Sequence, residues 1–268
     1  DGVQCPCILL QLIATGKPLS TAGMMIEDRI CTYTIAMERT VVPENFSFRM
    51  TDEEYRVLEK IKNSIPVCYL ADHADFALGI VTGNNKKFLS AEKTENSEMV
   101  LKGTDICKYH INPVKQYLRF EPEQFQQVAP LEIYRAPEKL LYRFISNQLV
   151  VAYDDRQMLS LNSCNIVIPK IDGMQIKYIL AILNSSVSQF VYQKEFHSIK
   201  VLRAHMEHIP IPRVGKAIQN EIIAMTEPLI CGMGKEAAET CQKRLDCRIM
   251  DLFRLSAEEQ WIIRHALH

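Results

Sequence analysis

The sequence lacks the signatures of several common protein classes, and each absence narrows what the chain can do. No apolar run approaches the ~18 residues of a membrane-spanning helix, so we expect no membrane partner. It contains no P-loop, no Gly-x-Ser-x-Gly and no His-Glu-x-x-His, which mark phosphate-binding loops, hydrolase nucleophiles and zinc peptidases. Because no coherent catalytic set remains, we predict a chain without enzymatic turnover of its own.

Cysteine and histidine are present but not in ligand patterns. The nine cysteines are scattered singly, are odd in number and form no Cys-x-x-Cys, which favours reduced thiols in a cytoplasmic protein. Cys5 and Cys7 have no further ligands at a familiar zinc spacing, and His205 and His208 have no acidic or cysteine partner at a useful distance in the sequence. We therefore predict no metal site.

Excess positive charge is also missing, since the net charge is only −1. This argues against strong nucleic-acid binding, because phosphates are neutralised by lysine and arginine. The charge is uneven, however. Residues 79–213 carry 17 Lys and Arg against 13 Asp and Glu, whereas residues 1–78 carry 7 against 11 and residues 214–268 carry 7 against 8. A weak, salt-sensitive interaction of the middle third with DNA is thus permitted.

The apolar pattern predicts an α+β fold. Residues 140–153 form two short apolar runs around a turn, and residues 166–168 form another before Pro169, which is typical of strands. Residues 174–192 place apolar side chains three and four positions apart, as one buried helix face does. Further strands are expected at 67–70, 76–81, 106–111 and 117–120, and further helices at 51–65, 215–230, 236–253 and 256–267. We predict a mixed, mostly antiparallel sheet body with packed helices and a C-terminal helical hairpin.

Several segments, in order, resemble the TaqI-like specificity domain, the DNA target-recognition region of many adenine methyltransferases and fused restriction-modification enzymes. They are residues 137–141 (PEKLL), 149–154 (LVVAYD), 179–185 (ILAILNS) and 209–212 (IPIP). Residues 79–88 (GIVTGNNKKF) are similar to the entry loop of that domain, and residues 101–106 (LKGTDI) to one of its strand starts. Residues 245–259 resemble the C-terminal helical signature of such enzymes and of type I specificity subunits.

The resemblance implies a domain organisation. Residues 1–45 would be a remnant of the C-terminal edge of a methyltransferase catalytic domain, residues 46–213 the DNA target-recognition domain, and residues 214–268 a C-terminal helical segment. Because the chain starts at Asp1 without an initiator methionine, we expect it to be part of a longer protein.

Outside the expected strands, residues 82–87 (TGNNKK) are the stretch whose residue types most clearly indicate a turn or a loop that binds DNA. Gly83 allows backbone conformations closed to other residues, asparagine can pair bidentately with adenine, and lysine can meet phosphate or guanine. Composition alone favours a hairpin turn with solvated lysines, whereas the resemblance favours a loop that faces DNA.

A second stretch, residues 193–205, combines cations with Tyr192 and Phe196, a combination that could grip phosphates and stack on a base. A solvated loop after a helix explains the same residues equally well. The candidate DNA contacts are Thr82, Gly83, Asn84, Asn85, Lys86, Lys87, Lys102, Lys194, His197, Lys200 and Arg203.

The catalytic motifs of the family are missing. Its adenine methyltransferases use Asn/Asp-Pro-Pro-Tyr/Phe and a glycine-bearing loop for S-adenosylmethionine, but here Asn112 and Pro113 are followed by Val114. The resemblance thus implies sequence-specific recognition of double-stranded DNA for the methyltransferase catalytic domain of the same parent chain. S-adenosylmethionine would bind that parent enzyme, and this part would hold no cofactor. The alternative is a protein-interaction module that joins subunits without touching DNA.

Overall fold

The computed structural model describes residues 21–27, 32–39, 49–196 and 198–267 and divides into two compact units, Asp1–Asp52 and Glu53–His268. In the first unit, β1 (Met24–Glu27) pairs antiparallel with β2 (Thr32–Ile35). The Asp52 carboxylate accepts hydrogen bonds from the backbone of Ala36 and from the buried Arg39 guanidinium, both at 2.8 Å. Much of the predicted remnant, residues 1–45, lies outside the described residues, and the domain boundaries at 45 and 213 stay predictions.

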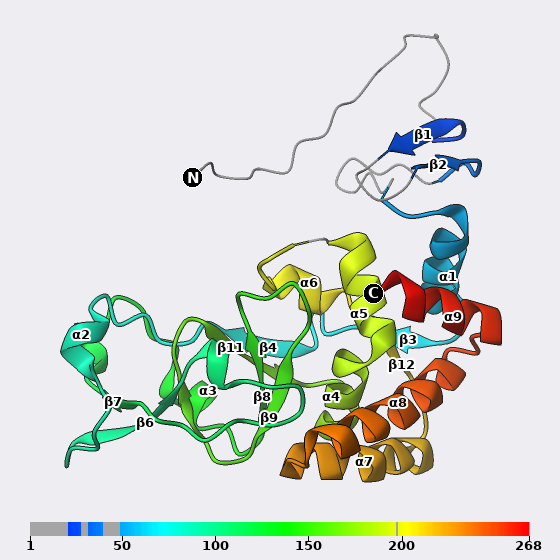
Figure 1. The fold of residues 1–268 in the computed structure, drawn as a ribbon. Helices are drawn as coiled ribbons and strands as arrows, with labels where there is room; N and C mark the ends of the chain where they lie inside the picture. The colour runs from blue at the N-terminus through cyan, green and yellow to red at the C-terminus, as the bar shows by residue number, and fades with distance from the viewer. Residues whose placement is uncertain (1–20, 28–31, 40–48, 197, 268) are drawn as a thin grey trace. The chain divides into compact units, whose positions relative to one another are not determined.

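The second unit is built on two four-stranded sheets (Figure 1). One is fully antiparallel, with its strands in the order β4 (Ala74–Ala77), β11 (Cys164–Pro169), β8 (Lys139–Arg143) and β9 (Val151–Asp154). The other has the order β10 (Leu159–Ser160), β6 (Ser97–Leu101), β7 (Tyr117–Arg119) and β5 (Leu89–Ser90), and only its β10–β6 pair is parallel. The mostly antiparallel sheet body is therefore confirmed.

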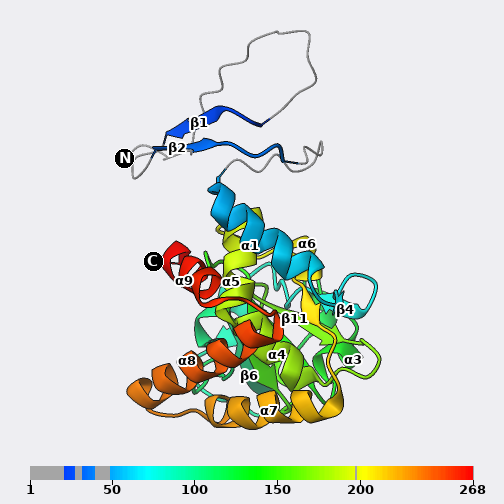
Figure 2. The same ribbon diagram turned by 90° about the vertical axis from the view of Figure 1, so that its right-hand side faces the viewer.

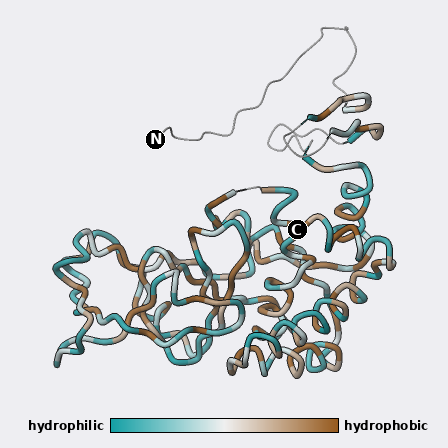
Figure 3. Tube along the Cα trace, in the orientation of Figure 1, coloured by the Kyte–Doolittle hydropathy of each residue, from teal (hydrophilic) through white to brown (hydrophobic). Residues whose placement is uncertain are grey.

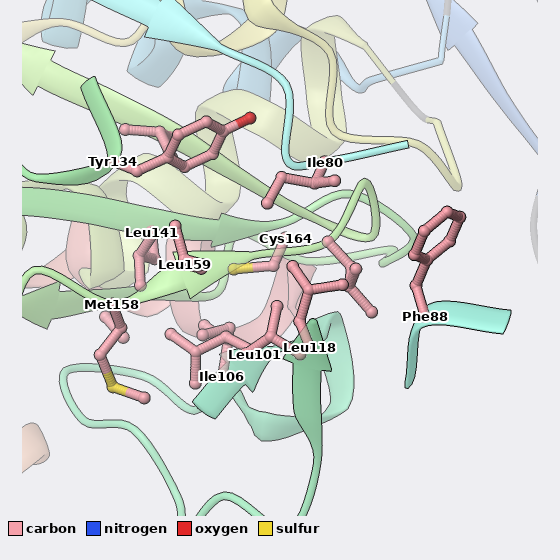
Figure 4. Packing of buried hydrophobic residues seen from close by; sticks show 14 residues of the cluster. Ile80, Phe88, Leu101, Ile106, Leu118, Tyr134, Leu141, Met158, Leu159 and Cys164 are labelled. Atoms are coloured by element: carbon pink, nitrogen blue, oxygen red, sulfur yellow. The ribbon is translucent and has the colours of Figure 1, made fainter. Parts of the chain in front are cut away.

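Apolar side chains from both sheets form one buried cluster (Figure 4). Leu101 and Leu118 come from one sheet, Leu141 and Cys164 from the other, and all four are fully buried. Burial raises the pKa of the Cys164 thiol well above its usual range, so this thiol is inert packing and not a nucleophile. The cysteines in the described ranges are free thiols, namely Cys68, Cys107, Cys164, Cys231, Cys241 and Cys247.

Three helices cover the C-terminal part of the chain and confirm the predicted helical hairpin. They are α7 (Lys216–Cys231), α8 (Lys235–Leu252) and α9 (Ala257–Ala266). Helices α7 and α8 run side by side and pack near α4 (Figure 2). Along them apolar and polar residues alternate (Figure 3), and no helix in the described ranges is long and apolar enough to cross a bilayer.

The single helix predicted over 174–192 is in fact two helices, α4 (Ile176–Asn184) and α5 (Ser186–Glu195). Ser185 takes an extended conformation between them, and its hydroxyl accepts a hydrogen bond from the Ser188 backbone N–H at 3.3 Å. The apolar periodicity continues across Ser185, which is why the sequence predicts one helix. The Ser185 hydroxyl, however, caps the N-terminus of α5 by accepting a hydrogen bond from an N–H group that has no partner inside that helix.

The remaining elements are short. The predicted helix at 51–65 is α1 (Asp52–Asn63). The IPIP segment at 209–212 contains β12 (Ile211–Pro212), which pairs with β3 (Val67–Cys68). Residues 106–111 were expected to be a strand, but they form isolated bridges instead, one between Ile106 and Ile111 and one between Tyr109 and Ala152. The other short helices are η1 (Gly103–Asp105), η2 (Pro122–Gln124), α3 (Leu131–Tyr134) and α6 (Arg203–Glu207).

Candidate nucleic-acid interface

Residues 82–88 form a capped helical turn and not the plain hairpin turn that composition favours. Helix α2 spans Asn85–Phe88, and the Asn84 side chain at its N-cap accepts a hydrogen bond from the Lys87 backbone N–H at 3.3 Å. The buried Thr82 hydroxyl donates to Asn85 Oδ1 at 2.7 Å. Gly83 has φ +73°, which a residue with a side chain adopts only at a cost. The amides and the glycine thus build the turn.

Backbone pairing holds residues 79–88, here called the α2 segment, from two sides. On one side Val81 and Gln127 exchange N–H···O bonds of 2.9 and 3.0 Å. On the other side the Ile80 N–H donates to the Ser160 carbonyl at 2.7 Å, and the Asn162 N–H donates to the Ile80 carbonyl at 3.1 Å. The α2 segment is therefore fixed in position, although its tip is exposed.

Two open depressions flank α2. The first, of about 470 Å³, is lined by Thr82, Gly83, Asn84, Lys87, Phe88 and residues 123–126. The second, of about 400 Å³, is lined by Asn85, Lys86, Leu89, Lys102, Gln116 and residues 161–163. Helix α2 thus contributes residues to both depressions. Lys86 and Lys102, which are separated in the sequence by residues 87–101, line the second depression together.

The cations of this surface are exposed and carry no carboxylate partner within the described ranges. Lys86, Lys87 and Lys102 are all exposed, and none forms an ion pair there. The Lys87 ammonium donates to Gln124 Oε1 at 2.6 Å and lies 4.8 Å from the centroid of the Phe88 ring. Phe88 is itself buried and meets the Phe125 ring edge-on at 5.1 Å. Lys87 is therefore placed by the Phe88–Phe125 pair and by Gln124.

The other predicted contacts do not line either depression. Lys194 lies in α5 and its ammonium pairs with Glu54 at 2.7 Å, with both side chains only 16% exposed. Arg203 begins α6, pairs with Glu207 at 2.7 Å and lies 5.2 Å from the Phe76 ring centroid. Lys200 lies 6.0 Å from the Phe144 ring. His197 lies outside the described residues.

The predicted residues thus separate into two groups. Thr82 to Lys87 join Lys102 around α2, whereas Lys194, Lys200 and Arg203 belong to α5, α6 and the loop between them (Figure 1). Sequence reasoning missed the polar residues that complete the depressions, namely Gln116, Glu123, Gln124, Gln126, Asn162 and Ser163. The Gln-rich composition of 122–130 was the available signal for three of them.

Within the part of the chain that the structure describes, no three histidine, cysteine or acidic side chains gather as a metal site would require. Around α2 the polar groups are ammonium, carboxamide and hydroxyl groups, with the Glu123 carboxylate at one rim. Ammonium groups bind anions, and carboxamide and hydroxyl groups bind hydrogen-bonding edges.

Comparison with solved structures gives distant matches. The "Type IIL restriction-modification enzyme MmeI in complex with DNA" matches with TM-score 0.48 and 12% identity, over 75% of this chain and 35% of that one. The "HsdS subunit from Thermoanaerobacter tengcongensis" matches with TM-score 0.39 and 15% identity, over 80% and 50%. The "type IIG restriction endonuclease BpuSI" matches with TM-score 0.45 and 14% identity, over 81% and 32%. The chain therefore spans about a third to a half of these chains.

Comparison of the sequence with family models is more specific. No curated protein matches the sequence. Residues 98–211 match the model of the TaqI-like C-terminal specificity domain. The matched segment runs from β6 into β12 and includes Lys102, whereas the α2 segment precedes it and α7 to α9 follow it. The resemblance seen in the sequence motifs is thereby confirmed over residues 98–211, which are similar to the TaqI-like C-terminal specificity domain.

Proposed function

We propose that this chain recognises a short sequence in double-stranded DNA as the target-recognition part of an adenine-N6 DNA methyltransferase or restriction-modification enzyme. The family match of residues 98–211 carries the proposal. Methyl transfer and the binding of S-adenosylmethionine belong, in this proposal, to the methyltransferase catalytic domain of the same parent protein.

The surface around α2 supports DNA binding on physical grounds. Lys86, Lys87 and Lys102 are exposed cations on two adjacent depressions, and lysine side chains bind phosphate oxygens. A helix with its side chains is roughly 10–12 Å across, which fits the roughly 12 Å width of the DNA major groove. With α2 in the groove, Lys87 on one flank and Lys86 with Lys102 on the other face the two phosphate backbones.

A charge reversal on α2 tests the placement. Duplex binding is measured by fluorescence anisotropy at several salt concentrations for the wild type and for Lys86→Glu/Lys87→Glu. Each lysine that contacts phosphate contributes about −0.9 to the slope of log K against log salt, so the double variant should bind more weakly and reduce the steepness by about 2.

The matched control is Lys235→Glu/Lys243→Glu, which makes the same charge change on exposed positions of α8. This control tests for the effect of net charge alone. Equal losses in both variants, or none in the α2 variant, would show that DNA does not bind around α2.

One observation favours a protein-interaction module instead. Ile145 and Ile199 are 54% and 72% exposed, and the Ser146 N–H donates to the Ile199 carbonyl at 2.9 Å, which holds the two apolar side chains on neighbouring loops. Exposed apolar patches are frequent at protein interfaces. If the chain binds no duplex at low salt but binds a separately expressed methyltransferase domain, and Ile199→Ser weakens that binding, this second function is supported.

A further inference from the structure

We propose that the carboxamides of Gln126 and Asn162, and not those of Asn84 and Asn85, read base edges in the DNA. This inference rests on the proposed function and specifies it. It replaces the asparagines singled out in the sequence with two residues that share their chemistry and line the same two depressions.

The side chains of Asn84 and Asn85 already have structural tasks. Asn84 Oδ1 accepts the Lys87 N–H at 3.3 Å, and Asn85 Oδ1 accepts the Thr82 hydroxyl at 2.7 Å. A bidentate contact to adenine uses the oxygen and the nitrogen of one carboxamide in a common plane. Because the internal bonds set the direction of each oxygen, both groups are oriented by the turn and not toward a ligand.

The backbone at Gln126 is held in place by its neighbours, whereas its carboxamide is available to bind a ligand. It precedes Gln127, which exchanges two backbone hydrogen bonds with Val81, and a Cβ atom at Gly83 would lie only 3.4 Å from Gln126 Cβ. The side chain is exposed, lines the first depression beside Lys87, and makes no hydrogen bond to any part of the chain that the structure describes.

Asn162 has the same character on the opposite flank of α2. Its backbone N–H donates to the Ile80 carbonyl at 3.1 Å, and the neighbouring Ser163 hydroxyl accepts the Gly103 N–H at 2.9 Å. The exposed carboxamide lines the second depression with Lys86 and Lys102 and has no hydrogen-bonding partner among residues 21–27, 32–39, 49–196 and 198–267.

The first depression thus holds the Gln126 carboxamide beside Lys87, and the second holds the Asn162 carboxamide beside Lys86 and Lys102. Lysines that hold phosphates fix the position of the duplex, and anchored side chains then contact bases with little loss of freedom. Asparagine and glutamine pair bidentately with the N6 and N7 atoms of adenine in the major groove. The recognised site therefore contains an A·T pair at the position that each of the two residues reads.

The experiment is a selection from duplexes with a randomised central segment, carried out with the wild-type chain, Gln126→Ala and Asn162→Ala. We expect the wild type to enrich a sequence, and each variant to lose preference at one adenine of that sequence. The loss in discrimination should be about 5- to 150-fold at that position, with affinity for an unrelated duplex changed by less than about 2-fold.

Gln127→Ala and Asn147→Ala are the matched controls, because both side chains are exposed and line neither depression. Circular dichroism verifies that every variant is folded. If Gln126→Ala and Asn162→Ala keep the wild-type preference at every position, or if Asn84→Ala alone relaxes it, the inference is wrong while the proposed function stands. If the wild type enriches no sequence, the proposed function fails and the inference fails with it.

Discussion

The Asn184 side chain pairs with both backbone groups of Val151. Its Oδ1 accepts the Val151 N–H at 3.1 Å, and its Nδ2 donates to the Val151 carbonyl at 2.8 Å. Gln189 does the same for Leu149, with distances of 2.9 and 3.0 Å. Two carboxamides at the α4–α5 junction thus take the place of a neighbouring strand beside β9, which gives the Leu-Asn-Ser motif at 183–185 a structural task.

Asn184→Ala should lower the free energy of unfolding by about 1–3 kcal/mol. The substitution leaves the buried Val151 N–H without its Asn184 partner, and an unsatisfied buried group costs about 1–3 kcal/mol. The Val151 carbonyl keeps the hydrogen bond that it accepts from the Tyr109 N–H at 2.7 Å. Urea unfolding followed by circular dichroism gives the value. Asn147→Ala, at an exposed turn position, should change it by less than about 0.5 kcal/mol. Equal effects of the two substitutions would contradict the structural task of Asn184.

Gly79→Ala should be more damaging than Gly83→Ala. A Cβ atom at Gly79 would lie 2.1 Å from the Leu161 carbonyl oxygen and 2.7 Å from that of Cys164, and backbone atoms of paired strands have little room to move. At Gly83 the nearest atom is 3.4 Å away, so only the φ of +73° opposes the substitution. We expect a loss of about 1–2 kcal/mol at Gly83 and a larger loss at Gly79, measured by urea unfolding. The reverse order would contradict the close packing of the α2 segment against residues 161–164.

Buried tyrosines predict a loss of stability at alkaline pH. Burial raises the pKa of Tyr142 to about 12 and that of Tyr192 to about 12, whereas an unfolded tyrosine titrates near pH ~10. The native state keeps these protons longer than the unfolded state does. Their contribution is thus complete below pH ~10 and is lost as the pH rises toward ~12.

The measurement is the free energy of unfolding between pH 8 and 11.5, together with tyrosinate absorbance. Tyr142→Phe should make the decline of the free energy of unfolding with pH less steep, because phenylalanine has no proton that the unfolded state would release before the native state. If the buried tyrosines ionise near pH ~10 while the chain stays folded, their contribution to the pH dependence is absent.

Strong periodicity and turn chemistry allowed much of this fold to be predicted. The predicted helices at 215–230, 236–253 and 256–267 are present, and each buries one apolar face. The predicted strands at 140–153 and 166–168 are also present, as short apolar runs that are buried at successive positions. The expected strand at 106–111 failed because Tyr109 has φ +73° and its backbone pairs with Val151 and Tyr153. Such long-range pairing leaves no periodic signal in the segment itself.

The candidate site was harder to predict for the same reason. Lys102 lines the same depression as Lys86 because β6 pairs with β10, and the Ile80 N–H of the α2 segment bonds to the Ser160 carbonyl of β10. Gln126 and Asn162 are ordinary loop residues in the sequence. Their places beside α2 come from the backbone bonds of the neighbouring Gln127 to Val81 and of Asn162 to Ile80. Conversely, Asn84 and Asn85 were predicted to contact bases because the composition of the loop does not reveal that their side-chain oxygens accept hydrogen bonds within the turn.

Lys102 and Lys194 were both predicted to contact DNA, and the structure allows their roles to be separated. Lys102 is exposed beside Lys86, so Lys102→Gln should weaken duplex binding and reduce the steepness of the salt dependence by about 1 while leaving the free energy of unfolding nearly unchanged. Lys194 is paired with Glu54 in a largely covered site, so Lys194→Gln should instead lower stability, because the largely covered Glu54 carboxylate loses the charge of the Lys194 ammonium.

Anisotropy with duplex DNA and urea unfolding, applied to both variants, separate the two effects. Glu54→Gln is the control on the other side of the ion pair, and it should resemble Lys194→Gln in stability and the wild type in DNA binding. Should Lys194→Gln reduce the salt dependence as much as Lys102→Gln while Glu54→Gln does not, the DNA surface would extend from α2 to α5. In that case the ion pair with Glu54 would have to open when the duplex binds, because one ammonium group cannot neutralise a phosphate and a carboxylate equally.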